Sequence, residues 1–296
     1  MDFDSFMGQA WDDHAADPQG VAARLGDAGL ALLAQADPDA QATQLPALAT
    51  LAHHVYGEHL GQWHEGQALL QMLAALPAAA APGAAADALR RCQASLALCA
   101  GDADARSGLS AADAIRVGAM AAAGLGPHDA ARASLLLQDA VDATAQTALP
   151  AADPALRALA VNGNNLASTL EEKTSRSDEE RALMILAAQT ARTYWALAGG
   201  WLETERAEYR LAMTWLAAGD PARARQHADA CLAIVSANDG AALERFFGWE
   251  ALALVHRASD DAEGHAQAIA EMDQAFTALD EADRGWCQAS LDKARA

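Results

Sequence analysis

The chain contains 296 residues, of which 52% are hydrophobic, and it carries a formal net charge of −20. Roughly a quarter of the residues are alanine, the strongest helix former, and β-branched residues are scarce, so the composition predicts an all-α fold. This acidity argues against nucleic acid as a partner, because phosphate binding needs clustered lysine and arginine. No uncharged apolar stretch reaches the ~18 residues of a membrane span, so we expect no membrane association.

The acidic residues are concentrated toward the N-terminus, where residues 1–80 contain Arg24 as their one basic side chain. Such a region either attracts a basic partner or is a solvated surface that keeps an alanine-rich chain in solution. The sequence starts with MDFDSFMGQAWDD, which lacks the basic and apolar regions of a signal peptide. The four cysteines form no CxxC pair and are expected to pack as small hydrophobic residues in a reducing compartment, so we expect a cytoplasmic protein.

Proline and glycine punctuate the N-terminal half into expected helices. We expect two short helices within residues 1–36, a helical pattern over 46–76 that is interrupted at Leu60-Gly61, an Ala/Pro/Gly connector at 78–84, and further helices over 85–100, 110–124 and 128–148. Residues 102–109 fit either a short second helix or a loop, so the exact helix register in 85–126 stays open.

The segment PAADP at 150–154 is the best candidate for an internal hinge, near residues 149–154, between residues 1–148 and 155–296. Ser177 and Glu180 have the spacing of a capping box, which predicts a helix start. After the hinge, we expect helices over 155–172, 177–199, 201–218, 221–236, 240–258 and 261–280, and a capping helix over 282–295.

The clearest repeated unit lies at residues 207–235. Ala212 and Ala224 are small where two paired helices must touch, Trp215 is large where space must be filled, and Gly219 marks the turn. Residues 46–77 share part of this spacing through Gly61, Trp63, Gly66 and Pro77, and residues 161–198 contain NNLASTLEE.

These residues resemble the tetratricopeptide repeat (TPR) family, in which each repeat of about 34 residues forms a helix–turn–helix. The resemblance covers most of residues 1–296 and implies one all-α, right-handed solenoid of stacked antiparallel helix hairpins that ends in a C-terminal capping helix. In such repeats, the first helix of each pair lines a concave groove in which peptides often bind.

The family pattern places eight residues on the groove face and makes them candidate peptide- or partner-binding residues: Asn164, Ser168, Glu171, Arg206, Tyr209, Met213, Phe246 and Trp249. An asparagine amide can both donate to and accept from a peptide backbone, an arginine can pair with a carboxylate, and tyrosine and tryptophan offer amphipathic contact area. The alternative is that Asn164 bonds a neighbouring helix and the aromatic residues belong to the core.

The segment HHVYGEHLGQWHEG contains four histidines and two glutamates: His53, His54, Glu58, His59, His64 and Glu65. Imidazole and carboxylate groups suit zinc, nickel or copper, and His54 and Glu58 have the i, i+4 spacing that lets two side chains share an ion. His54, His59 and His64 are spaced five residues apart, so on an α-helix their side chains point in different directions. We therefore expect no metal site and no cofactor.

Known enzyme signatures are missing from the sequence: it contains no GxGxxG after a strand, no GxxxxGK[ST], no GxSxG and no HExxH. We expect a non-enzymatic scaffold or adaptor that binds a protein or peptide partner. The alternatives are a sensor module that responds to a ligand or peptide through the hinge, a metal-handling protein, and a self-assembling structural homo-oligomer.

Overall fold

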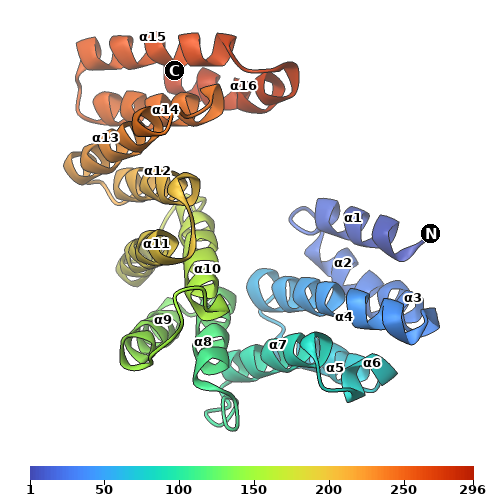
Figure 1. Ribbon diagram of the computed structural model, residues 1–296. Coiled ribbons are helices and arrows are strands. Elements are labelled where there is room, and N and C mark those ends of the chain that lie inside the picture. Colours follow the sequence, from blue (N-terminus) through green and yellow to red (C-terminus); the bar gives the residue numbers. More distant parts are fainter. The chain divides into compact units, whose positions relative to one another are not determined.

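A computed structural model describes all residues from 1 to 296 and contains helices and no strands (Figure 1). This confirms the predicted all-α class. The chain forms two compact units, residues 1–149 and 150–296, so the division falls in the Pro- and Ala-rich segment that ends at Pro154. None of the helices combines the length and the apolar character that are needed to cross a lipid bilayer. All four cysteines are buried free thiols.

The N-terminal unit contains nine α-helices and two π-helical turns. They are α1 (Phe3–Asp13), α2 (Pro18–Arg24), η1 (Leu25–Gly29), α3 (Leu30–Gln35), α4 (Pro38–His53), η2 (His54–His59), α5 (Trp63–Ala74), α6 (Pro77–Ala80), α7 (Ala84–Ala100), α8 (Ala111–Leu125) and α9 (Ala130–Gln146). Helices α4 and α5 pack on α7, α7 packs on α8, and α8 packs on α9.

Helix α4 begins at Pro38, whereas the sequence pattern predicted a start at Pro46. The Asp37 carboxylate accepts hydrogen bonds from two backbone N–H groups of the first turn, and Pro38 stands where a missing N–H costs nothing. Pro46 therefore lies inside a helix, where proline removes one backbone hydrogen bond. The fully buried side chains of Leu45 and Leu48 supply the packing that offsets this loss.

In two other segments of this unit, the structure corrects one expectation and decides between two alternatives. The expected connector at 78–84 is partly helical, because Pro77 starts the single turn α6 instead of closing a repeat. Residues 102–109 form turns and no helix, which selects the loop alternative. After this loop, the Ser110 hydroxyl accepts a hydrogen bond from the N–H of Asp113 and caps α8, as predicted.

The C-terminal unit consists of three helix hairpins and one further helix. They are α10 (Pro154–Glu171) with α11 (Asp178–Ala198), α12 (Trp201–Ala217) with α13 (Pro221–Ala237), α14 (Ala242–Ala258) with α15 (Ala262–Thr277), and α16 (Glu281–Arg295), which packs on α14 and α15. The expected boundaries agree to within a few residues. Helices packed in sequential pairs are typical of a helical repeat.

Local chemistry accounts for where these helices begin. Ser177 and Glu180 form both hydrogen bonds of the predicted capping box. Asp220 caps α13 ahead of Pro221 after a turn in which Gly219 has φ +81°, a conformation that glycine adopts at little cost. Where the paired helices touch, side chains are small: a Cβ on Gly163 of α10 would lie 2.7 Å from the carbonyl oxygen of Ala187 in α11. The hairpins therefore pack with backbones in close approach.

Candidate functional site

The first helix of each hairpin in the C-terminal unit contributes to the same hollowed face. Helices α10 and α12 pack side by side, as do α12 and α14, and α16 packs against α14. Two cavities lie along this face, and each receives residues from all four helices. Arg210 of α12 lines both cavities. The two cavities are therefore neighbouring parts of one surface.

The first cavity, here called the aromatic pocket, has a volume of about 430 Å³. It is lined by Asn164, Glu205, Arg206, Tyr209, Arg210, Leu243, Glu244, Phe247 and Trp286. The ring of Phe247 lies between two other rings, 5.6 Å from Tyr209 and 5.3 Å from Trp286, both in edge-on geometry. Trp286 is 66% exposed and forms an apolar rim.

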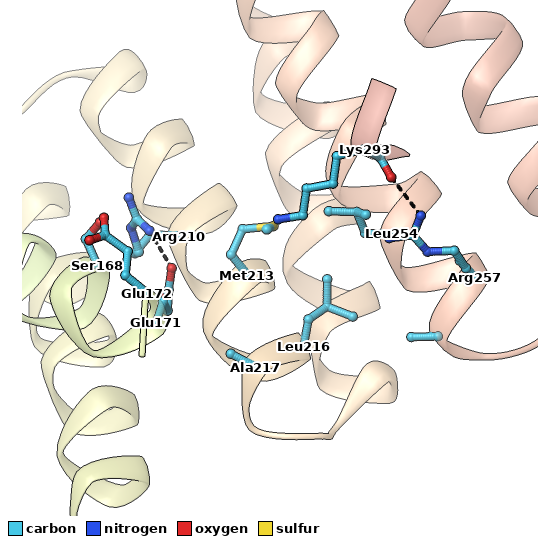
Figure 2. A pocket seen from close by; sticks show the side chains of 11 residues that line it. Ser168, Glu171, Glu172, Arg210, Met213, Leu216, Ala217, Leu254, Arg257 and Lys293 are labelled. Carbon is cyan, nitrogen blue, oxygen red and sulfur yellow. Dashed lines mark hydrogen bonds and ion pairs between the residues drawn. The ribbon is translucent and has the colours of Figure 1, made fainter. Parts of the chain in front are cut away.

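The second cavity, here called the charged pocket, has a volume of about 610 Å³ (Figure 2). It is lined by Ser168, Glu171, Glu172, Arg210, Met213, Leu216, Ala217, Leu254, Arg257, Ala258 and Lys293. Figure 2 shows Glu171 and Glu172 on one side of the cavity, with Arg257 and Lys293 on the opposite side. Three basic and two acidic side chains line a cavity whose floor is apolar.

Six of the eight residues predicted from the sequence line these cavities. Asn164, Arg206 and Tyr209 lie in the aromatic pocket, whereas Ser168, Glu171 and Met213 lie in the charged pocket.

The prediction for Phe246 is wrong, because its side chain is completely buried in the core formed by α12–α16. The next residue, Phe247, lines the aromatic pocket in its place. A register error of one position turns a helical side chain by about 100°, enough to exchange groove and core. Trp249 is half-buried, packs against the same core and lines neither pocket.

Ion pairs and hydrogen bonds hold the polar side chains of the aromatic pocket in place. Arg206 Nη2 lies 3.1 Å from Glu244 Oε1, which joins α12 to α14. Glu205 is 1% exposed and accepts a hydrogen bond from the Cys231 thiol. Burial raises the pKa of Glu205 to about 7, so at neutral pH a large part of this carboxyl is protonated and able to donate a hydrogen bond.

Glu171 is held by two side chains of α12. It receives hydrogen bonds from the Arg210 guanidinium and from the Thr214 hydroxyl. Burial raises the pKa of Glu171, while these two partners act in the opposite direction. The ion pair between Arg210 and Glu171 joins α12 to α10 at a side chain that lines both pockets.

Arg257 and Lys293 have no carboxylate within ion-pair distance. Arg257 donates to the backbone carbonyls of Lys293, at 2.8 Å, and Ala294, at 3.4 Å, which complements the C-terminal end of α16. The Lys293 ammonium is not part of an ion pair, although its charge acts on the buried Glu250 and opposes the rise in the pKa of that carboxyl. The cavity therefore contains two cations without a carboxylate partner within 4 Å.

Comparison with known proteins adds no relative to this picture. No protein-family model matches the chain, and no curated protein or solved structure matches it. What the pockets bind is therefore inferred from their geometry and chemistry.

The repeat pattern missed most of the other residues that line the two pockets, among them Arg210, Phe247, Arg257, Trp286 and Lys293. Lys293 had a signal in the sequence, because it is one of two lysines in the chain and lies in the expected capping helix. That helix was assigned a structural role, and the pattern contains nothing to show that α16 reaches over the groove face.

The side-chain amide of Asn164 is not used to hold neighbouring helices together. Its Nδ2 donates to Oδ1 of the adjacent Asn165 at 3.3 Å, and it bonds no neighbouring helix. The amide is half-buried at the aromatic pocket, where an extended backbone can both accept from it and donate to it.

Proposed function

We propose that this protein is a non-enzymatic scaffold or adaptor that binds an extended segment of a protein partner across the aromatic and charged pockets. The observation that carries the proposal is the alignment of the two cavities on one face of α10, α12, α14 and α16, with Arg210 lining both. The proposal includes a TPR-like, right-handed stacking of the hairpins, because first helices that share a face are typical of that repeat.

The chemistry of the pockets favours a partner segment with one apolar and one acidic anchor. The aromatic pocket offers the edge-on rings of Tyr209, Phe247 and Trp286, and aromatic residues dominate the energetics of protein interfaces. The charged pocket offers Arg257 and Lys293 without carboxylate partners. A carboxylate of the bound segment, from a side chain or from a chain end, would provide the missing counter-charge.

The size of the cavities agrees with this assignment. Volumes of about 430 and 610 Å³ fall in the range of about 300–1,000 Å³ that is typical of ligand sites, so each accommodates one or two side chains. Two ion pairs already form within the protein, Arg206 with Glu244 and Arg210 with Glu171. We expect these side chains to hold the helices that line the pockets in place and not to bind the partner.

Selection from a random peptide library, followed by fluorescence anisotropy with the enriched peptides, tests the proposal. We expect enriched peptides to combine an apolar side chain with an acidic group, and we expect Trp286→Ala to weaken their binding roughly tenfold or more. Trp201→Ala is the matched control, because Trp201 is a 39% exposed tryptophan of α12 that lines neither pocket.

Equal loss of binding in the two tryptophan variants would reject the assigned site. An exposed aromatic side chain such as Trp286 can also mediate self-assembly. Light scattering at several concentrations distinguishes self-assembly from binding of a different protein. A molar mass that rises with concentration and falls back in Trp286→Ala would show that a second copy of the chain occupies the site.

A further inference from the structure

The π-helical turn η2 brings His54 and His59 together. In an α-helix, five residues rotate a side chain by about 140° relative to the first, which was the reason to expect no metal site here. In a π-helix the backbone bonds run from residue i to i+5, so side chains with this spacing lie above one another. The structure has a π-helical turn over His54–His59, and the Nε2 atoms of the two rings are 3.1 Å apart.

A third histidine reaches this pair from the end of α1. The His14 ring centroid lies 5.0 Å from that of His54 and 5.1 Å from that of His59. One ring nitrogen from each of the three residues lies within 4.8 Å of the other two. His14 is separated from the pair by forty positions of sequence, so the fold alone brings the three imidazoles together.

The other ring nitrogens of two of these histidines are held by acceptors. His54 Nδ1 lies 3.0 Å from a carboxylate oxygen of Glu58, and His14 Nδ1 contacts the backbone carbonyl oxygen of Trp11. An Nδ1–H that donates to a carboxylate or a carbonyl leaves Nε2 as the free lone pair. Histidines that bind metals in proteins are oriented by second bonds of this kind.

The remaining histidines of the predicted segment are placed elsewhere. His53 is buried and bonded to the Ser95 hydroxyl at 2.8 Å, and His64 is bonded to Gln67 at 3.3 Å on α5. The segment therefore contributes His54 and His59 to the cluster, while His14 comes from outside it.

We propose that His14, His54 and His59 bind a divalent transition-metal ion, with Zn²⁺ as the best fit, and that Glu58 positions the His54 ring. Three imidazole nitrogens suit Zn²⁺, which has borderline-soft character and accepts tetrahedral coordination with an open fourth position. Zn–N bonds of about 2.0–2.1 Å place two ligand nitrogens of one tetrahedral ion about 3.3–3.4 Å apart. The 3.1 Å separation between His54 and His59 is close to that value.

Isothermal titration of the full-length, untagged and chelator-stripped protein with ZnCl₂ tests this site. We expect about one ion per chain, and a loss of affinity of roughly tenfold or more in His14→Ala and in His59→Ala. His64→Ala is the matched control, because it removes a nearby histidine that lies outside the cluster. Glu58→Gln is expected to weaken binding about 10–100-fold through the orientation of His54.

Two measurements keep the result interpretable. Circular dichroism establishes that each variant remains helical, including His14→Ala, which changes the residue at the C-terminal end of α1. X-ray absorption at the zinc edge is expected to show imidazole nitrogen ligands in the wild type. Folded wild-type protein that binds no Zn²⁺, or zinc binding that is equal in wild type, His14→Ala and His59→Ala, would overturn the proposal.

Discussion

The hydroxyl of Tyr209 in α12 donates a hydrogen bond of 2.8 Å to the Glu250 carboxylate in α14. Both groups are largely removed from water, and Glu250 is 3% exposed. Burial raises the pKa of Glu250, and burial together with this carboxylate raises the pKa of Tyr209 well above its usual value. A residue predicted to bind a partner thus also joins two neighbouring hairpins.

Replacing Tyr209 with phenylalanine separates these two roles. Tyr209→Phe keeps the ring of the aromatic pocket but removes one of two donors to a buried carboxyl, since Ser290 also bonds Glu250, so we expect the free energy of unfolding to fall by about 1–2 kcal/mol. Peptide binding should change little, since the ring remains. Urea denaturation measures the stability, and Tyr194→Phe is the control, because the hydroxyl of this buried tyrosine makes no hydrogen bond within the protein. Equal stability of both variants would contradict the expectation.

Glu205 should make stability depend on pH. Its pKa is raised by burial from 4.5 to about 7 in the folded protein, so the folded state binds the proton more tightly than the unfolded state. The stabilisation is complete below pH ~4.5 and is lost as the pH rises through about 7. Between pH ~4.5 and pH ~7, this titration should lower the unfolding free energy of the wild type by roughly 2–3 kcal/mol. We expect this contribution to be missing in Glu205→Gln, because glutamine does not titrate.

Denaturation of the wild type and Glu205→Gln at a series of pH values checks this sign. The difference between the two proteins isolates Glu205 from all other titrating groups. Glu65→Gln is a useful control on a carboxyl of the N-terminal unit that lies on the surface. A difference that stays constant from pH 5 to pH 8 would show that Glu205 does not titrate in this range.

The charged pocket predicts that peptide binding depends on salt. If Arg257 and Lys293 attract an acidic group, affinity should fall as salt shortens the Debye length from about 10 Å at 0.1 M to about 3 Å at 1 M. Lys293→Met should lower both the affinity and its salt dependence. Arg245→Ala is the matched control, because Arg245 is exposed on α14 and lines neither pocket. An unchanged salt dependence in Lys293→Met would place the acidic contact elsewhere.

Two glycine substitutions should change stability in opposite directions. Gly163→Ala places a methyl group 2.7 Å from the Ala187 carbonyl oxygen and 3.1 Å from the Ala191 nitrogen. Because both neighbours are backbone atoms of α11, we expect a loss of about 1–3 kcal/mol. In Gly285→Ala, the new methyl group meets nothing within 4 Å at an exposed position of α16, so we expect a gain of about 0.4–1 kcal/mol in the free energy of unfolding. Thermal melting of both variants is sufficient, and a stabilised Gly163→Ala would refute the close packing of α10 and α11.

Local signals in the sequence were sufficient for most helices of the C-terminal unit. Ser177 with Glu180, and Asp220 with Pro221, act through bonds within one helical turn, so a reader of the sequence can recognise them. Pro46 shows the limit of such signals. A proline usually ends or begins a helix, but here the buried leucines around it keep it inside α4.

Helix caps and small-residue spacing depend on near neighbours, so the all-α class, the helix pairs of the C-terminal unit and six pocket-lining residues could be predicted from the sequence. Whether Phe246 or Phe247 lines the aromatic pocket could not be predicted in this way, because it depends on how α14 is rotated about its axis against the packed core. The same holds for the meeting of His14 with His54 and His59, which requires both a π-helical turn and a contact between segments far apart in the chain. Long-range packing selects such arrangements, and no local pattern encodes them.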